Sequence, residues 1–221
     1  KPNVIIVVAY GKIIPTKLLN IKDIKFINVH ASLLPKWRGA APIQRSIMNL
    51  DSETGISIMK LAPKLDTGPI LINSKVKILK ETTYENLSYQ LSKLGAKLTL
   101  ESLNLIENGK DVFIDQNENE ATYAKKISKT ETKINWEDNA ERILAKINAL
   151  YPNPGSWFNY NGSRLKIIRA IEVQEKGKPG EIINSNFTIA CLKNAIQILE
   201  LQKEGKKKMK VSEYLKGNKL I

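Results

Sequence analysis

The residues of this chain with the clearest chemical potential are Asn28, His30 and Asp66, which carry an amide, an imidazole and a carboxylate. Asn28 and His30 lie two positions apart at the end of the apolar run 25–30, so in a strand both side chains face the same side. Asp66 lies in the glycine-bounded turn 65–68, which could return to His30. Singly, each residue is more often structural, but together they can polarise a carbonyl, move a proton and orient the imidazole.

The chain offers no nucleophile beside these three residues. Its only cysteine, Cys191, lies far along the chain in a strand-like segment, and His30 is its only histidine. This favours transfer between two bound substrates over a covalent enzyme intermediate. Without a Cys/His cluster we expect no metal and no disulfide. No apolar run is long enough for a bilayer, so we expect a cytoplasmic protein without a membrane partner.

The first part of the chain has the pattern of an α/β domain, which we place at residues 1–115. A proline at position 42 and the capping box 82–85 mark the starts of two expected helices. The expected strands are residues 2–9, 25–30, 55–61 and 69–78, and the last two flank Asp66.

The second part has a different period. A polar stretch predicts a linker at residues 116–135, and a helical stripe then begins at Trp136. Short strand patterns separated by Gly-, Asn- and Lys-rich turns follow, which is typical of a small β-barrel over residues 136–221. The expected strands are residues 156–160, 164–173, 180–184, 187–192 and 195–202.

The net charge of +13 is concentrated in the second part, with +4 over residues 1–120 and +9 over residues 121–221. A polyanionic partner would explain this excess. A composition biased toward Ile, Lys and Asn would explain it equally well, so charge alone does not decide between the two.

The run INVHASLLPKWRGAAPIQ at 27–44, followed by LDTGPIL at 65–71, resembles the methionyl-tRNA formyltransferases. The SLLP loop is shared by the wider formyltransferase group, whereas the continuation WRGAAPIQ resembles the tRNA branch more than the purine-pathway or hydrolase branches. The resemblance extends over nearly the whole chain, through residues 123–127, 151–155 and 202–207.

The resemblance implies a partial Rossmann-like formyltransferase domain followed by an OB-like domain. It implies transfer of the formyl group of 10-formyltetrahydrofolate to the α-amino group of initiator methionyl-tRNA for translation initiation, by a monomer. Asn28, His30 and Asp66 match the catalytic positions of the family. The folate-binding positions it implies are Ser32, Leu33, Leu34, Pro35 and Asp66.

Attack of an amine on a formyl group develops an oxyanion, to which Asn28 can donate. His30 is the side chain suited to moving the amine proton, with Asp66 orienting it directly or through a water. Arg38 could contact the tRNA 3′ end or support its own loop. The other candidates for tRNA phosphates are Lys125, Lys126, Lys129, Arg164, Lys166, Arg169, Lys206, Lys207, Lys208 and Lys210.

The opening KPNVIIVVAYGKIIP resembles the fourth strand of the family's catalytic domain. At about 30 residues per βαβ unit, we expect roughly 80 preceding residues of the domain to be missing from this sequence. We therefore expect that the chain alone neither folds properly nor is active. Two alternatives remain open. One is a 10-formyltetrahydrofolate hydrolase or small-amine formyltransferase, and the other is a non-catalytic nucleic-acid-binding fragment.

Overall fold

A computed structural model describes residues 2–218 and 220. The chain forms two compact units. The first comprises the residues up to 126 apart from 47–50 and 80–85, and the second comprises those two segments together with the residues from 127 on.

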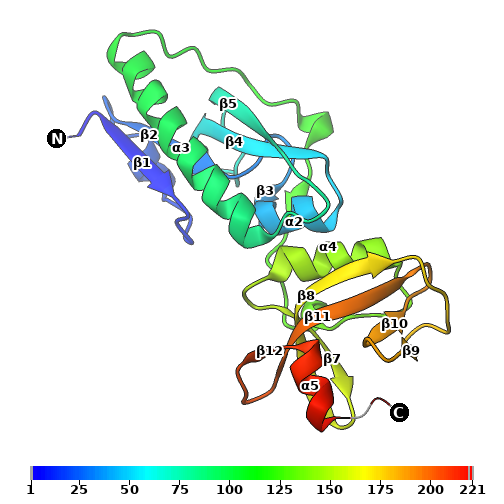
Figure 1. Ribbon diagram of the computed structural model, residues 1–221. Helices are drawn as coiled ribbons and strands as arrows, with labels where there is room; N and C mark the ends of the chain where they lie inside the picture. The colour runs from blue at the N-terminus through cyan, green and yellow to red at the C-terminus, as the bar shows by residue number, and fades with distance from the viewer. Residues whose placement is uncertain (1, 219, 221) are drawn as a thin grey trace. The chain divides into compact units, whose positions relative to one another are not determined.

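A four-stranded mixed sheet forms the centre of the first unit (Figure 1). Its strands, in spatial order, are β1 (Val4–Val8), β2 (Lys25–His30), β4 (Glu53–Lys60) and β5 (Ile70–Lys77). All four coincide with strands expected from the sequence. Only β1 and β2 are parallel, since β4 pairs antiparallel with both β2 and β5. The loop between β4 and β5 returns the chain alongside itself.

The helix α3 (Tyr84–Glu107) covers one face of this sheet. Leu87, Leu91 and Leu98 form its buried stripe, at the spacing of one helix face. A Cβ placed on Gly95 would lie 3.2 Å from Cγ1 of Val29, so the helix approaches β2 closely on the Val29 side. Since side chains alternate along a strand, Asn28 and His30 face away from α3.

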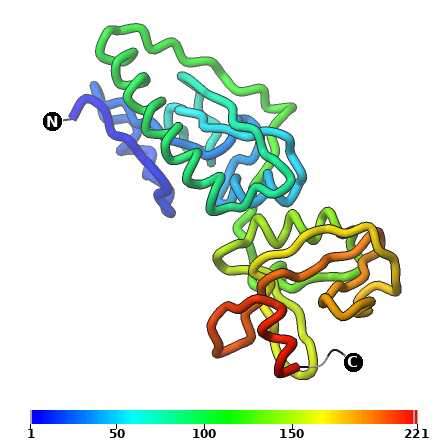
Figure 2. Tube along the Cα trace, viewed as in Figure 1, coloured from blue at the N-terminus to red at the C-terminus, as the bar shows by residue number. Residues whose placement is uncertain are grey.

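The chain after α3 runs back along the unit, as Figure 2 shows. It forms a bridge between Ile114 and Ile70, a 3-10 turn η1 (Glu118–Glu120) and the short strand β6 (Tyr123–Ala124). β6 pairs in parallel with β3 (Arg38–Gly39), which precedes α2 (Pro42–Met48). The remaining helix, α1 (Thr16–Leu19), lies between β1 and β2 in the chain. Much of the segment predicted as a linker is thus part of the first unit.

The second unit is an antiparallel sheet with the helix α4 (Ala140–Leu150) packed on it, following the short turn η2 (Thr130–Thr132). Ile143, Ile147 and the buried side chains of the sheet form one core with Phe187 at its centre. The strands in chain order are β7 (Ser156–Tyr160), β8 (Ser163–Val173), β9 (Ile182–Asn184), β10 (Thr188–Ala190), β11 (Ala195–Lys203) and β12 (Lys208–Lys210).

The five strands expected from the sequence are present, but they do not close into a barrel. The strand order is β7-β8-β11-β10-β9, with β12 on β11, and no pairing between β7 and β9 joins the ends within the described residues. β9 and β10 have three residues each, which leaves little edge for closure. Two further elements were not anticipated, namely β12 and the terminal helix α5 (Val211–Gly217).

Candidate functional site

The structure brings His30 and Asp66 together in the first unit. His30 is the last residue of β2, and Asp66 lies in the loop between β4 and β5. The imidazole Nδ1 is 3.7 Å from the carboxylate Oδ2, and the two side chains are only 7% and 12% exposed. The separation is longer than a direct hydrogen bond, and it becomes an ion pair only when the imidazole is protonated.

The orientation of His30 is set by the backbone of Trp37. The imidazole Nε2 lies 2.9 Å from the Trp37 carbonyl oxygen. Because a carbonyl can only accept a hydrogen bond, Nε2 carries the hydrogen, and Nδ1 is the nitrogen that gains or loses a proton. Trp37 has a φ of 62°, which turns the chain sharply after the SLLP loop.

Asp66 is fixed from two sides. Its Oδ2 accepts a hydrogen bond of 2.8 Å from the Gly39 backbone N–H. Two residues later the loop passes the end of β4 so closely that a Cβ on Gly68 would lie 1.7 Å from the Lys60 carbonyl oxygen. Only glycine fits at that position, which explains the glycine of the Asp-Thr-Gly sequence.

Asn28 lies on the same face of β2 as His30. Its side chain is partly exposed. It makes no hydrogen bond to any other residue that the structure describes. A strand-end amide without a protein partner has its N–H groups available for a ligand.

The SLLP loop is held largely through hydrogen bonds made by its backbone N–H and C=O groups. Ser57, which lies opposite His30 on β4, donates from Oγ to the Ser32 carbonyl and accepts from the Leu34 N–H, at 2.8 and 3.1 Å. Leu33 and Pro35 carbonyls accept from Lys36 and Thr122 N–H groups. Contacts of Ser32–Pro35 with a folate would therefore add to bonds that already shape the loop.

Arg38 is completely buried, so in this structure it does not face solvent or a nucleic acid. Its guanidinium donates to Gln116 Oε1 from Nε and NH2, and to both carboxylate oxygens of Glu118, at 2.7–3.0 Å. The hydrogen bond to Glu118 raises the pKa of Arg38, and the same bond lowers the pKa of Glu118. This geometry favours the alternative in which Arg38 supports its own loop.

Among the described residues, this site contains neither a thiol nor a cluster of candidate metal ligands. Cys191 belongs to the core of the second unit, and burial raises the pKa of its thiol to about 12. No group of three His, Cys, Asp or Glu residues suited to a metal ion occurs among residues 2–218 and 220. None of the helices in that part of the chain is both long and apolar enough to span a bilayer.

The second unit carries several of the basic candidates on one face of its sheet. Lys166, Gln202 and Lys208 are cross-strand partners on β8, β11 and β12, and Arg169, Glu200 and Lys210 form the next row. Directly paired residues project from the same face. A register irregularity between these rows turns Arg169 outward although Leu165 and Ile167 are buried.

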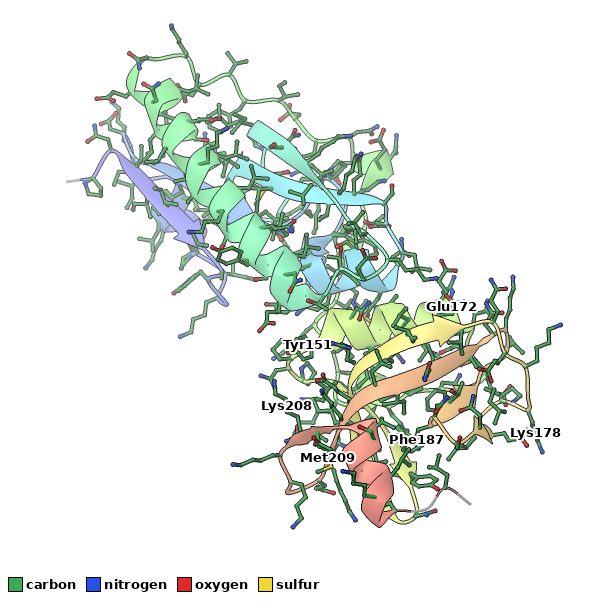
Figure 3. The ribbon with its side chains drawn as sticks, in the orientation of Figure 1. Tyr151, Glu172, Lys178, Phe187, Lys208 and Met209 are labelled. Atoms are coloured by element: carbon green, nitrogen blue, oxygen red, sulfur yellow. The ribbon has the colours of Figure 1, made fainter. Side chains whose placement is uncertain are left out.

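We call Lys166, Arg169, Lys208 and Lys210 the basic sheet face. Lys208 is exposed, whereas its neighbour Met209 packs toward the core (Figure 3). Lys166 lies against a pocket of about 180 Å³, where burial lowers its pKa. Arg164 also lines that pocket, with its guanidinium stacked 3.9 Å from the Trp157 ring centre.

The other basic candidates are exposed on connecting segments. Lys125 and Lys126 follow β6 in the first unit, where their carbonyls accept from Arg45. Lys129 precedes the turn η2, and Lys206 and Lys207 occupy the turn between β11 and β12. Lys208 and Lys210 belong to the strand β12.

Sequence comparison relates both parts of the chain to formyl transferases. Residues 1–103 match the family model described as formyl transferase, and residues 126–219 match the formyl transferase C-terminal domain. A methionyl-tRNA formyltransferase of Pelagibacter ubique is 47% identical over 99% of this chain and 71% of its own length. That of Dictyoglomus thermophilum is 44% identical over all of this chain and 73% of its own length.

Solved structures with the same fold are more distant in sequence. HypX from Aquifex aeolicus, in complex with tetrahydrofolic acid, has a TM-score of 0.74 at 20% identity, covering 97% of this chain and 38% of HypX. An N-formyltransferase from Helicobacter canadensis, in complex with folinic acid and dTDP-3-aminofucose, has a TM-score of 0.69 at 21% identity, covering 86% of this chain and 71% of that one. At this identity the likeness shows the fold alone.

Proposed function

The chain belongs to the methionyl-tRNA formyltransferase family, and from that premise we propose that Asn28, His30 and Asp66 catalyse its reaction. The activity is transfer of a formyl group to methionyl-tRNA. We propose 10-formyltetrahydrofolate as the donor and the α-amino group of initiator methionyl-tRNA as the acceptor. The observation that carries the assignment is the contact of His30 Nδ1 with Asp66 beside the unpaired Asn28 amide.

His30 takes the proton that the attacking amine must lose. Nε2 is engaged by the Trp37 carbonyl, so Nδ1 is the basic atom, and it faces Asp66 at 3.7 Å. Once Nδ1 is protonated, the carboxylate stabilises the imidazolium by a charge interaction in a poorly hydrated place. Nδ1 then gives the same proton to the folate nitrogen as that nitrogen leaves. The folate co-substrate supplies the formyl group that is transferred.

Asn28 donates an N–H to the oxygen of the formyl group as negative charge develops on it. Ser32 to Pro35 and Asp66 are our candidates for the folate contact. The bonds from Ser57 and Thr122 fix that loop before any ligand binds, which lowers the entropy lost on binding.

We place the contact with tRNA phosphates on the second unit. The basic sheet face and Arg164 offer cations on adjacent strands. Cations side by side on one surface suit the phosphates of a polyanionic backbone. Lys125, Lys126, Lys129, Lys206 and Lys207 remain further candidates, and contact by Arg38 would require release from Glu118. We also propose that the enzyme is cytoplasmic and monomeric. We propose further that the second domain is OB-like, although its sheet does not close into a barrel within the described residues.

Replacing both Lys208 and Lys210 by Gln should weaken tRNA binding and flatten its salt dependence. Each lost phosphate contact removes about one unit from the slope of log K against log salt, so the double variant should lose about two. Affinity is measured by filter binding from low to moderate salt. Lys178→Gln is the control, since Lys178 is exposed elsewhere in the same unit (Figure 3). An unchanged slope in the double variant would exclude the basic sheet face.

The proposed function is tested by measuring consumption of 10-formyltetrahydrofolate with and without methionyl-tRNA. A transferase consumes the donor only when the charged tRNA is present. A hydrolase would proceed at the same rate without it, and a small-amine formyltransferase would proceed only when a small amine is added in place of the tRNA. A non-catalytic binding fragment would not proceed in any of these cases.

A further inference from the structure

We propose that Gln116 is a positioning residue for formyl transfer, which holds the Asp66 carboxylate in register with His30. The inference rests on the proposed function of His30 and Asp66. Gln116 lies in the segment predicted as a linker and has no part in the proposed catalytic chemistry of Asn28, His30 and Asp66.

The side-chain amide of Gln116 links the two loops that meet at the site. Its Nε2 donates to the backbone carbonyls of Asp66 and Gly68, at 2.9 and 2.7 Å. Its Oε1 accepts from Nε and NH2 of Arg38, at 3.0 and 2.8 Å. Every strong hydrogen-bonding position of the amide is therefore in use, which leaves this side chain a single orientation.

These bonds complete a closed circuit around the carboxylate. Arg38 is followed directly by Gly39, whose N–H donates to Asp66 Oδ2 at 2.8 Å. Arg38 is in turn held by Glu118 and by pairing of β3 with β6. Gln116 thus fixes the backbone of Asp66 relative to the backbone of Gly39, whose N–H holds the Asp66 carboxylate. The only direct tie from Asp66 toward the catalytic base is the 3.7 Å contact with His30 Nδ1.

A contact at this distance is sensitive to small displacements, because an error of about 1 Å in a catalytic geometry can cost about 100-fold in rate. Loss of the Gln116 amide should therefore lower kcat about 10- to 100-fold. The KM for methionyl-tRNA should change less than about threefold, since Gln116 lies outside the proposed tRNA contacts.

The two halves of the amide can be separated. Gln116→Glu keeps the acceptor for Arg38 but places a carboxylate oxygen against the carbonyls of Asp66 and Gly68. If Gln116 acts by fixing Asp66, this variant loses activity as Gln116→Ala does. If it acts only on Arg38, Gln116→Glu retains the activity of the unmodified enzyme, and the proposal is wrong. Asn119→Ala is the matched control, an exposed residue of the same segment outside the circuit.

A double-mutant cycle tests whether the effect passes through Asp66. In the Asp66→Asn background, removal of Gln116 should cost less than about threefold in kcat, because there is no carboxylate left to position. A general structural role would cost the same in both backgrounds, and that result would overturn the proposal.

Hydrogen exchange at the Gly39 amide provides a readout that does not depend on activity. We expect exchange to accelerate about tenfold in Gln116→Ala and Gln116→Glu, and to stay unchanged in Asn119→Ala. The measurements use the full natural chain. If the unmodified enzyme did not formylate methionyl-tRNA, the proposed function would fail while Gly39 exchange still reported on Gln116. Unchanged Gly39 protection in both variants would refute the positioning role.

Discussion

His30→Gln should lower kcat for formyl transfer by about 100- to 10,000-fold, the range expected for loss of a general acid–base. Glutamine is the informative replacement because its amide can still donate to the Trp37 carbonyl, as Nε2 of His30 does. What it lacks is a titrating atom at the position of Nδ1. The loss should therefore appear in the chemical step, which is measured by rapid quench with saturating substrates.

The affinity for methionyl-tRNA should be unchanged in this variant, since the proton moves only in the transition state. His30→Ala is the comparison: it also strands the Trp37 carbonyl, so it should unfold at lower temperature than His30→Gln. A kcat for His30→Gln within about threefold of the unmodified enzyme would remove His30 from proton transfer.

Asn28→Ala should lower kcat by about 100- to 1,000-fold, as expected for removal of one donor to a developing oxyanion. The structure supports a large catalytic effect with little cost in stability. The Asn28 amide has no hydrogen-bond partner among the described residues, so its removal leaves no protein group unpaired. Single-turnover rates and thermal unfolding together measure both quantities.

Asn73→Ala provides the control, because Asn73 is an exposed amide on β5 of the same sheet. It should leave both rate and stability unchanged. If Asn28→Ala lowered the unfolding temperature substantially and left kcat intact, the amide would be structural and the oxyanion role would be lost.

Periodicity predicted the local elements well. The alternation in residues 25–30 placed Asn28 and His30 on one face of β2, and the strands flanking Asp66 proved to be β4 and β5. Pairing direction was less accessible, because an apolar strand has the same sequence pattern whether its neighbour is parallel or antiparallel. For the same reason strand counting suggested a closed barrel, whereas closure depends on edge pairing that β7 and β9 do not make.

The supporting residues of the site were not predictable from the sequence. Gln116 and Thr122 lie in a polar stretch whose composition is that of a loop, and their roles depend on contacts between 48 and 87 positions away along the chain. Arg38 illustrates the converse difficulty. The sequence left open whether it contacts the tRNA 3′ end or supports its own loop, and the structure shows it completely buried and hydrogen-bonded to Gln116 and Glu118 of the later segment. Such contacts carry no local periodicity.

The most direct test of the central claim is to follow the formyl group through a single turnover. Enzyme in excess is mixed with 10-formyltetrahydrofolate labelled in the formyl carbon and with methionyl-tRNA, and the products are separated after quenching. The account predicts that the label consumed appears as formyl-methionyl-tRNA, and that His30→Gln slows this step without diverting the label. Release of the label as formate, or equal rates for His30→Gln and the unmodified enzyme, would contradict it.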